Sequence, residues 1–255
     1  MDLFTSLRRT LSFEAQTSTY RLRMCSSPEE LKAIQRLRFV VFNLELREGL
    51  SASYQTGLDQ DPFDEVCEHL LVEHAASRTV VGTYRMQTGE QAKAHQGYYC
   101  SGEFDLAPYE ALRAEFLELG RACIHPDHRN FSVLSMLWRG IVQYAHHTGT
   151  RYLLGCSSLT SQDPAVGLQG YRTLQPQLAP EHLRTLPLAG MACQAREVPN
   201  GALPMPKLLS AYLALGAWIC GPPAIDTQFK TIDFLTLMDL QSPEMAKRRK
   251  RFGID

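Results

Sequence analysis

Apolar positions along the chain follow two periods, and the change from one to the other marks the predicted elements. They alternate or run together over short stretches that predict strands: residues 20–25, 69–74, 80–86, 118–124, 151–156, 192–198, 217–220 and 232–240. They recur at helical spacing over three longer stretches that predict helices: residues 28–41, 132–147 and 205–215. This alternation is typical of an α/β or α+β sheet with helices on its faces. We see no repeat or linker, so we predict one domain over residues 20–242, with an extension at 1–19 and a basic tail at 243–255.

The stretch from Glu118 to Arg129 joins a strand to the long helix that follows it. Proline fixes its own φ and restricts the residue before it, so His125-Pro-Asp127 between them is turn chemistry. Arg129 stands at the start of the helix, where unpaired N–H groups and the positive end of the dipole attract anions. The stretch therefore predicts an anion site, although the pattern also fits an ordinary strand, turn and helix with a surface arginine.

Three aspartates, at positions 59, 61 and 64, surround Pro62. Such a cluster fits either a site for a cation or ammonium group or simple turn capping. The spacing is not that of a calcium loop. The seven cysteines are scattered and form no C-x-x-C pair. We therefore predict no metal site and no disulfide framework.

Composition narrows the class of protein. The 255 residues are 44% apolar and 21% charged, which is typical of a globular protein. The net charge of −1 provides no overall attraction to nucleic acid, so no nucleic-acid partner is predicted. There is no run of eighteen apolar residues and no signal peptide, and the cysteine pattern suits a reducing compartment. A cytoplasmic location is the resulting expectation.

Several motifs, taken in order, resemble those of a known family. They are Arg36-Leu-Arg-Phe-Val-Val-Phe42, Asp61-Pro-Phe-Asp64, Val81-Gly-Thr-Tyr-Arg85, Tyr99-Cys-Ser-Gly-Glu-Phe-Asp105 and Glu118-Leu-Gly-Arg121. With later motifs they cover about residues 20–240, and they resemble the L-ornithine N-alpha-acyltransferases of the GNAT superfamily. That superfamily also holds the N-acyl amino acid synthases and acyl-homoserine-lactone synthases. The resemblance implies a GNAT-like fold: a central mixed, mostly antiparallel, splayed sheet flanked by helices.

The resemblance also implies a reaction, the transfer of a (3-hydroxy) fatty acyl group from a thioester to the α-amino group of an amino acid, most directly ornithine. Its implied catalytic residues are Glu118 as the base, Arg121, and Ser157, with Ser157 or Tyr171 as a proton donor to the departing thiol. Its implied amino-acid pocket is a charge lattice with an aromatic neighbour, formed by Arg38, Phe42, Asp61, Asp64 and Arg85. A purely structural salt-bridge network, with Glu118 paired to an arginine, is the alternative interpretation of these residues.

The donor site implied by the resemblance follows Glu118 along the chain. Backbone N–H groups at Ala122, Cys123 and Ile124 would stabilise the oxyanion. Arg129 and the amides of Ser132, Val133 and Leu134 would hold the donor's phosphate. Residues 129–134 lack the glycines of the pyrophosphate loop in acetyl-CoA-using relatives. This departure favours acyl-phosphopantetheine on acyl carrier protein as the donor, with acyl-CoA as a second candidate and no bound cofactor.

The two ends of the chain carry charge patterns with more than one interpretation. Residues 247–251 form the basic block Lys-Arg-Arg-Lys-Arg, which suits an acidic carrier protein, an anionic lipid surface or plain solvation. Leu3, Leu7 and Leu11 share a helical face, which fits peripheral contact with the inner face of a membrane or a locally packed terminus.

Two alternatives to the N-acyltransferase stay open at this stage. One is an autoinducer synthase of the acyl-homoserine-lactone type, which is disfavoured because residues 43–57 lack that family's tryptophan. The other is a non-catalytic, haemolysin-type binding protein with a GNAT-like fold.

Overall fold

The computed structural model describes residues 14–247, so the predicted N-terminal leucine face and residues 248–251 of the basic block lie outside the described chain. Within that range the chain forms two compact units. The first holds residues 14–87 and 119–149, and the second holds residues 88–118 and 150–247. Strand β5 (Phe116–Ile124) begins in the second unit and ends in the first.

The first unit is built on an antiparallel sheet whose strands follow chain order. Its first four strands are β1 (Ala15–Gln16), β2 (Tyr20–Met24), β3 (Glu68–His74) and β4 (Thr79–Thr88). Its helical elements are α2 (Pro28–Phe39), the π-helix η1 (Val40–Glu45), α3 (Ser53–Thr56), the 3₁₀ turns η2 (Pro62–Glu65) and η5 (Pro126–His128), and α5 (Phe131–Thr148).

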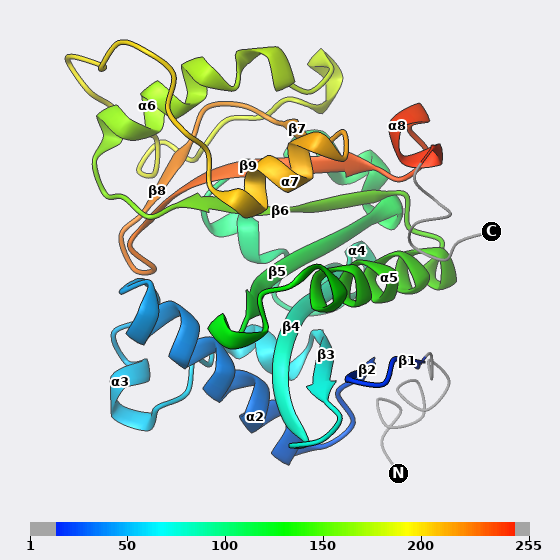
Figure 1. The fold of residues 1–255 in the computed structure, drawn as a ribbon. Coiled ribbons are helices and arrows are strands. Elements are labelled where there is room, and N and C mark those ends of the chain that lie inside the picture. The colour runs from blue at the N-terminus through cyan, green and yellow to red at the C-terminus, as the bar shows by residue number, and fades with distance from the viewer. Residues whose placement is uncertain (1–13, 248–255) are drawn as a thin grey trace. The chain divides into compact units, whose positions relative to one another are not determined.

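Helix α5 packs directly on β2 and β3 (Figure 1). A Cβ at Gly140 would stand 2.6 Å from a methyl carbon of Leu70 and 3.2 Å from one of Leu22. Only glycine allows this approach, so the helix lies close against the strands.

Helix α2 begins where the sequence predicts. The Ser27 hydroxyl accepts a hydrogen bond from the Glu30 amide at 3.2 Å, with Pro28 in the first turn. The predicted capping box differs in one detail, because the Glu30 carboxylate accepts from the Ser26 amide at 2.7 Å. The α-helical part ends at Phe39 and the chain continues as a π-helix, a form that is rare and concentrates at functional sites.

The second unit combines one parallel strand pair with antiparallel pairs. Residues Phe116–Glu118 of β5 pair in parallel with Tyr152–Leu154 of β6 (Tyr152–Leu159). Strand β6 then runs antiparallel along β9 (Thr231–Asp239), which also pairs with β7 (Trp218–Ile219) and β8 (Ala224–Asp226) (Figure 1). The predicted mixed, mostly antiparallel sheet with flanking helices is thus confirmed.

The second unit also contains several short helices. They are α4 (Gly89–Ala94), α6 (Pro164–Thr173), α7 (Lys207–Ala214), α8 (Pro243–Ala246) and the 3₁₀ helices η3 (Tyr99–Gly102), η4 (Ala107–Glu115), η6 (Gln175–Gln177) and η7 (Glu181–Leu183). The predicted strand at 192–198 is wrong: that segment is irregular and makes one isolated bridge, from Ala192 to Ala224.

The two faces of β6 and β9 pack against different cores. Leu154 and Leu235 lie on one face, in a cluster with Tyr98, Cys100 and Phe116. The opposite face carries the residues that pack against α6, which are Leu159, Ile232 and Phe234. Since side chains alternate along a strand, each position on β6 is assigned to one of these faces.

Candidate active site

A closed ring of alternating charges lies inside the first unit. Arg38, on the inner side of α2, has a fully buried side chain. Its Nε donates to Asp59 at 2.7 Å, and its two terminal nitrogens donate to both oxygens of Asp64 at 2.8 and 3.0 Å. Burial alone would raise the pKa of Asp64, but the cations Arg38 and Arg85 outweigh it and hold that pKa well below its usual range.

Two further arginines complete the ring through Asp61. Arg85 on β4 contacts Asp61 at 2.6 Å and Asp64 at 3.0 Å. Arg121 on β5 contacts Asp61 at 2.9 Å and Asp59 at 3.2 Å. Three arginines and three aspartates therefore alternate around one circuit with no net charge, which is the arrangement that compensates for their desolvation.

The structure brings together the four predicted lattice residues, and it adds Asp59 and Arg121 to them. Asp59 shares the spacing and turn of the other two aspartates, so the sequence contained its signal. Gln35 also belongs here, because its side chain donates to Asp64 at 2.9 Å from one turn earlier on α2. Since the buried side chain of Arg38 is fully paired, it offers an incoming carboxylate no free surface. Phe42, the predicted aromatic neighbour, is buried in η1 of the same unit.

Strand β5 contains one residue with an irregular backbone conformation, Arg121. This residue has a φ of +47°, the left-handed region that non-glycine residues rarely occupy. A left-handed residue inside a strand breaks the regular ladder and re-aims the neighbouring groups, at a cost of about 1–3 kcal/mol. The ion pairs of Arg121 with Asp59 and Asp61 offset that cost and fix the irregularity beside Ala122–Ile124.

Glu118 occupies the last position at which β5 pairs with β6. Its residue is 6% exposed. The carboxylate accepts hydrogen bonds from the backbone amides of Tyr99 at 2.9 Å and Cys100 at 2.8 Å, at the start of η3. Glu118 is thus held in one orientation by main-chain donors.

Ser157 lies on the other face of the sheet from Glu118. Glu118 pairs with Leu154, and strand alternation places position 157 opposite position 154. The Ser157 hydroxyl accepts a hydrogen bond from Thr236 Oγ1 at 2.9 Å. The structure therefore does not bring Ser157 and Glu118 together, because the register of β6 turns the Ser157 side chain to the other face, and the predicted role of Ser157 stays a prediction.

Arg129 is already engaged at the end of β5. Its guanidinium contacts the Glu45 carboxylate at 2.5 and 2.6 Å, and its Nε donates to the Ile124 carbonyl at 3.1 Å. The prediction placed this arginine at the start of the helix. In the structure Arg129 immediately precedes Asn130, the N-cap of α5, and the helix begins at Phe131. A phosphate at Arg129 would have to compete with Glu45.

The amides at the start of α5 are partly used by the helix itself. The Asn130 side chain accepts from the Val133 amide at 3.1 Å, and the Asn130 carbonyl accepts from the Leu134 amide at 3.3 Å. Of the three predicted phosphate-binding amides, Ser132 has no partner among residues 14–247.

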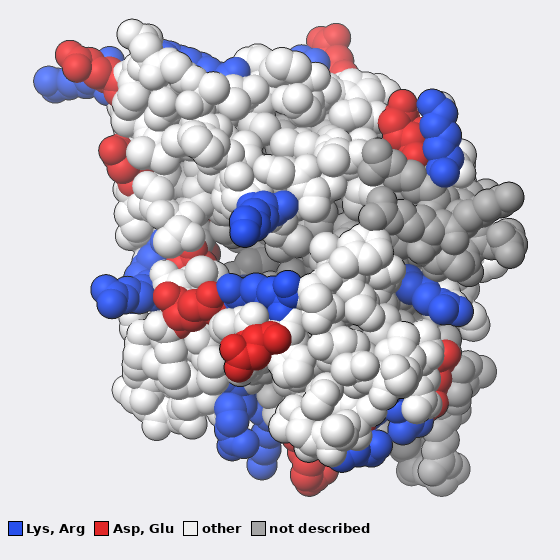
Figure 2. Space-filling view, viewed as in Figure 1, with Lys and Arg blue, Asp and Glu red and all other residues white. Residues whose placement is uncertain are grey.

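Charged side chains of both signs lie on the face of the molecule shown in Figure 2. They are interspersed, and the described residues of this face form no broad basic field for nucleic-acid phosphates. None of the helices between residues 14 and 247 is both long and apolar enough to traverse a lipid bilayer.

Comparison with known proteins defines the class. Residues 37–139 match the acetyltransferase (GNAT) domain. Two solved structures share the fold: FeeM, an N-acyl amino acid synthase from uncultured soil microbes (TM-score 0.54, 12% identity), and the acyl-homoserine-lactone synthase LasI (TM-score 0.52, 13% identity). Each alignment covers 93% of this chain and 96% of the other. The protein is an acyltransferase with a GNAT-type fold.

A closer relative defines the family. The L-ornithine N(alpha)-acyltransferase of Rhodobacter capsulatus is 34% identical over 248 residues, which are 92% of this chain and 94% of that protein. That of Brucella abortus is 32% identical over 238 residues, which are 86% of this chain and 84% of that protein. The chain belongs to the L-ornithine N(alpha)-acyltransferase family.

Proposed function

We propose that this acyltransferase moves a fatty acyl group from an acyl-carrier-protein thioester to the α-amino group of ornithine. The names of the relatives support the acceptor. The observation that carries the chemistry is Glu118, a carboxylate held by two backbone amides at the end of the β5–β6 pairing. Acyl transfer to an amine needs such an oriented base, because the ammonium form has no lone pair with which to attack.

The reaction proceeds by addition and elimination at the thioester carbonyl. Glu118, directly or through one water, takes a proton from the α-ammonium group, and the nitrogen then attacks the carbonyl carbon. A C–N bond forms, the C–S bond breaks, and the second proton of the nitrogen passes to the departing thiolate, which leaves as the free thiol. The amides of Ala122–Ile124, which follow the irregular residue Arg121, are the proposed donors to the oxyanion.

The donor is proposed to be held through phosphopantetheine. Residues 129–134 contain no glycine-rich loop for a pyrophosphate. The Ser132 amide at the start of an 18-residue helix is the proposed phosphate contact, since a helix N-terminus favours an anion. Arg129 would join it only by exchanging its Glu45 partner for the phosphate.

The experiment is product identification with both donors. Purified protein is incubated with 3-hydroxyacyl carrier protein or the matching acyl-CoA, with and without ornithine, and the products are measured by mass spectrometry. We expect N-acylornithine and an equal amount of free thiol, formed faster from the carrier protein and only when ornithine is present. Thiol release that ignores ornithine, or no amide from either donor, would refute the proposal.

A further inference from the structure

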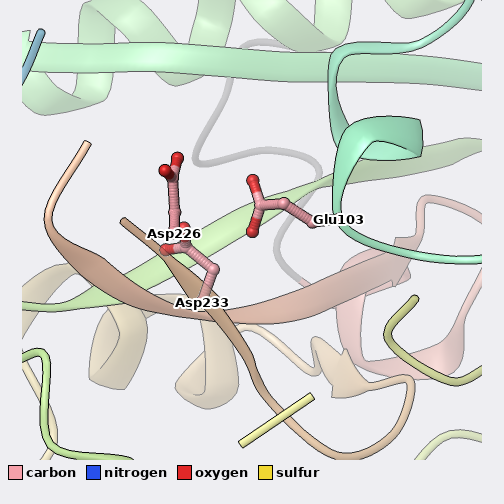
Figure 3. Close-up of side chains that lie close together, drawn as sticks. All are labelled: Glu103, Asp226 and Asp233. Carbon is pink, nitrogen blue, oxygen red and sulfur yellow. The ribbon is translucent and has the colours of Figure 1, made fainter. Parts of the chain in front are cut away.

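Three carboxylates converge in the second unit. They are Glu103, which follows η3, Asp226 at the end of β8, and Asp233 on β9. One oxygen from each lies within 4.8 Å of the others (Figure 3). The residues are only 4%, 7% and 3% exposed. We call this group the acidic triad.

The acidic triad is not satisfied by its surroundings. Asp226 accepts from the amides of Gln228 and Phe229 at 2.8 and 2.9 Å, and Asp233 Oδ2 accepts from Thr231 at 3.0 Å. By contrast, Glu103 Oε2 and Asp233 Oδ1 are buried and have no hydrogen-bond partner among the described residues. A buried carboxylate oxygen without a donor is costly and calls for a missing partner.

The contrast with the charged ring is direct. There, three arginines neutralise three aspartates. Within residues 14–247, no arginine or lysine side chain forms a salt bridge with any member of the acidic triad. A cationic ligand is therefore the partner that the acidic triad lacks.

The acidic triad and Glu118 lie on the same side of the second unit's sheet. Glu118 pairs with Leu154 and Asp233 pairs with Ser158. Positions 154, 156 and 158 share one face. Cys156, between them, donates from its thiol to Glu103 at 3.8 Å. Burial raises the pKa of the Cys156 thiol, and the charges of Glu103, Asp233 and Glu118 raise it further. The acidic triad and Glu118 therefore both lie near Cys156.

Helix η3 links the two groups a second time. Glu118 accepts from the amides at its start, and Glu103 follows its last residue. Three residues of 3₁₀ helix advance by about 6 Å, and the four β6 residues from 154 to 158 by about 13 Å. The two nitrogens of an extended ornithine lie about 6 Å apart. With a hydrogen bond at each end, ornithine reaches across about 12 Å, which is comparable with the advance of about 13 Å along β6.

We propose that Glu103, Asp226 and Asp233 bind the side-chain ammonium group of the acceptor amino acid, a specificity that rests on the proposed function. An ammonium group has three donors and no acceptor, which suits three converging carboxylates. Desolvation and the charges of Asp233 and Asp226 raise the pKa of Glu103 to about 10, and burial also raises that of Asp233. The acidic triad therefore holds a proton, shared between Glu103 and Asp233, that a bound ammonium replaces.

The test compares ornithine with norvaline, which has the same carbon chain but no terminal ammonium. Binding of each to the full-length protein is measured by titration calorimetry for the wild type, Asp233→Asn and Glu103→Gln. Glu73→Gln, a buried and arginine-paired carboxylate in the first unit, is the matched control. We expect the wild type and the control to prefer ornithine by on the order of 10- to 100-fold, and either triad variant to lose most of that preference while norvaline binding stays unchanged.

Three results would overturn the proposal. The first is an unchanged ratio of ornithine to norvaline affinity in both triad variants. The second is no preference for ornithine in the wild type. The third is Mn²⁺ binding, followed by electron paramagnetic resonance, that disappears in Asp233→Asn while ornithine binding persists, which would make the triad a metal site. Because these are binding measurements, they decide the inference even where no amide product forms, and that outcome would refute only the proposed reaction.

Discussion

The Glu118→Gln substitution tests the proposed base, and the structure sets the size of its effects. The carboxylate accepts from two backbone amides, of Tyr99 and Cys100. Glutamine has one acceptor oxygen, so its NH₂ group must face one of these amides and leave a buried donor unpaired. That costs about 1–3 kcal/mol of stability, or about 2–12 °C in Tm for a chain of this size. Loss of a positioned base should lower kcat by on the order of 10²–10⁴.

A second acceptor separates the loss of the base from the displacement of η3. The α-hydrazino analogue of ornithine carries a less basic nitrogen than ornithine, so a larger fraction of it is unprotonated at neutral pH and its attack depends less on prior proton removal. If Glu118 acts as the base, the variant should lose much less turnover with this analogue than with ornithine. The measurements are initial rates of thiol release with each acceptor, together with thermal unfolding of both proteins.

Two outcomes would refute the assignment. Equal losses with both acceptors would mean that Glu118 only positions η3 and the residues after it. Unchanged turnover of ornithine would remove Glu118 from the reaction altogether. If Tm falls while turnover of both acceptors stays unchanged, Glu118 only stabilises the start of η3.

Three further predictions concern charge. Arg38→Met removes one of the two arginine partners of the buried Asp59 and of the buried Asp64, leaves the ring with a net negative charge, and should lower the free energy of unfolding by about 3–5 kcal/mol in urea titrations; a value near zero would mean the ring contributes no stability. The pKa of Glu103 is about 10 in the fold against 4.5 ordinarily, so the folded state holds the extra proton and stability falls as pH rises from about 4.5 towards 10. In Glu103→Gln this part of the decline in Tm with pH should vanish, and an identical slope would contradict the shift. If residues 247–251 dock an acidic carrier protein, their deletion should abolish the salt dependence of the KM for that donor, whereas a retained dependence would exclude docking by this block.

The elements that could be predicted from the sequence are those specified by local chemistry. The start of α2 follows from Ser27 and Pro28, because a capping hydroxyl and a first-turn proline act within four residues. The long helix α5 follows from its apolar spacing and ends at Gly149, which has a φ of +71°. The strand predicted at 192–198 is wrong because strand pairing is not local: the segment meets β8 only at the bridge from Ala192 to Ala224, and an apolar run alone does not make a strand.

The parts of the site that could not be predicted depend on register. Ser157 is one residue from a position that shares Glu118's face, and a shift of one residue reverses a strand's side chains. Glu45 and Arg129 are 84 positions apart in the chain, so no local pattern predicts their ion pair. The acidic triad joins Glu103, which lies in the motif of residues 99–105, to a hairpin more than a hundred residues later, and no local pattern indicates that these two segments meet.

The charged ring and the acidic triad show how buried charge separates a structural network from a candidate binding site. In the ring, every arginine contacts two aspartates at 2.6–3.2 Å, so the fold itself compensates the desolvation of these charges. Removing any member leaves its neighbours with one partner fewer. In the acidic triad, two buried carboxylate oxygens have no hydrogen-bond partner among the described residues, and the pKa of Glu103 is raised, so the fold alone does not compensate these buried carboxylates. Such an uncompensated group is expected where a ligand supplies the missing positive charge. It follows that neutralising the ring should affect stability first, whereas neutralising the triad should affect the choice of substrate first.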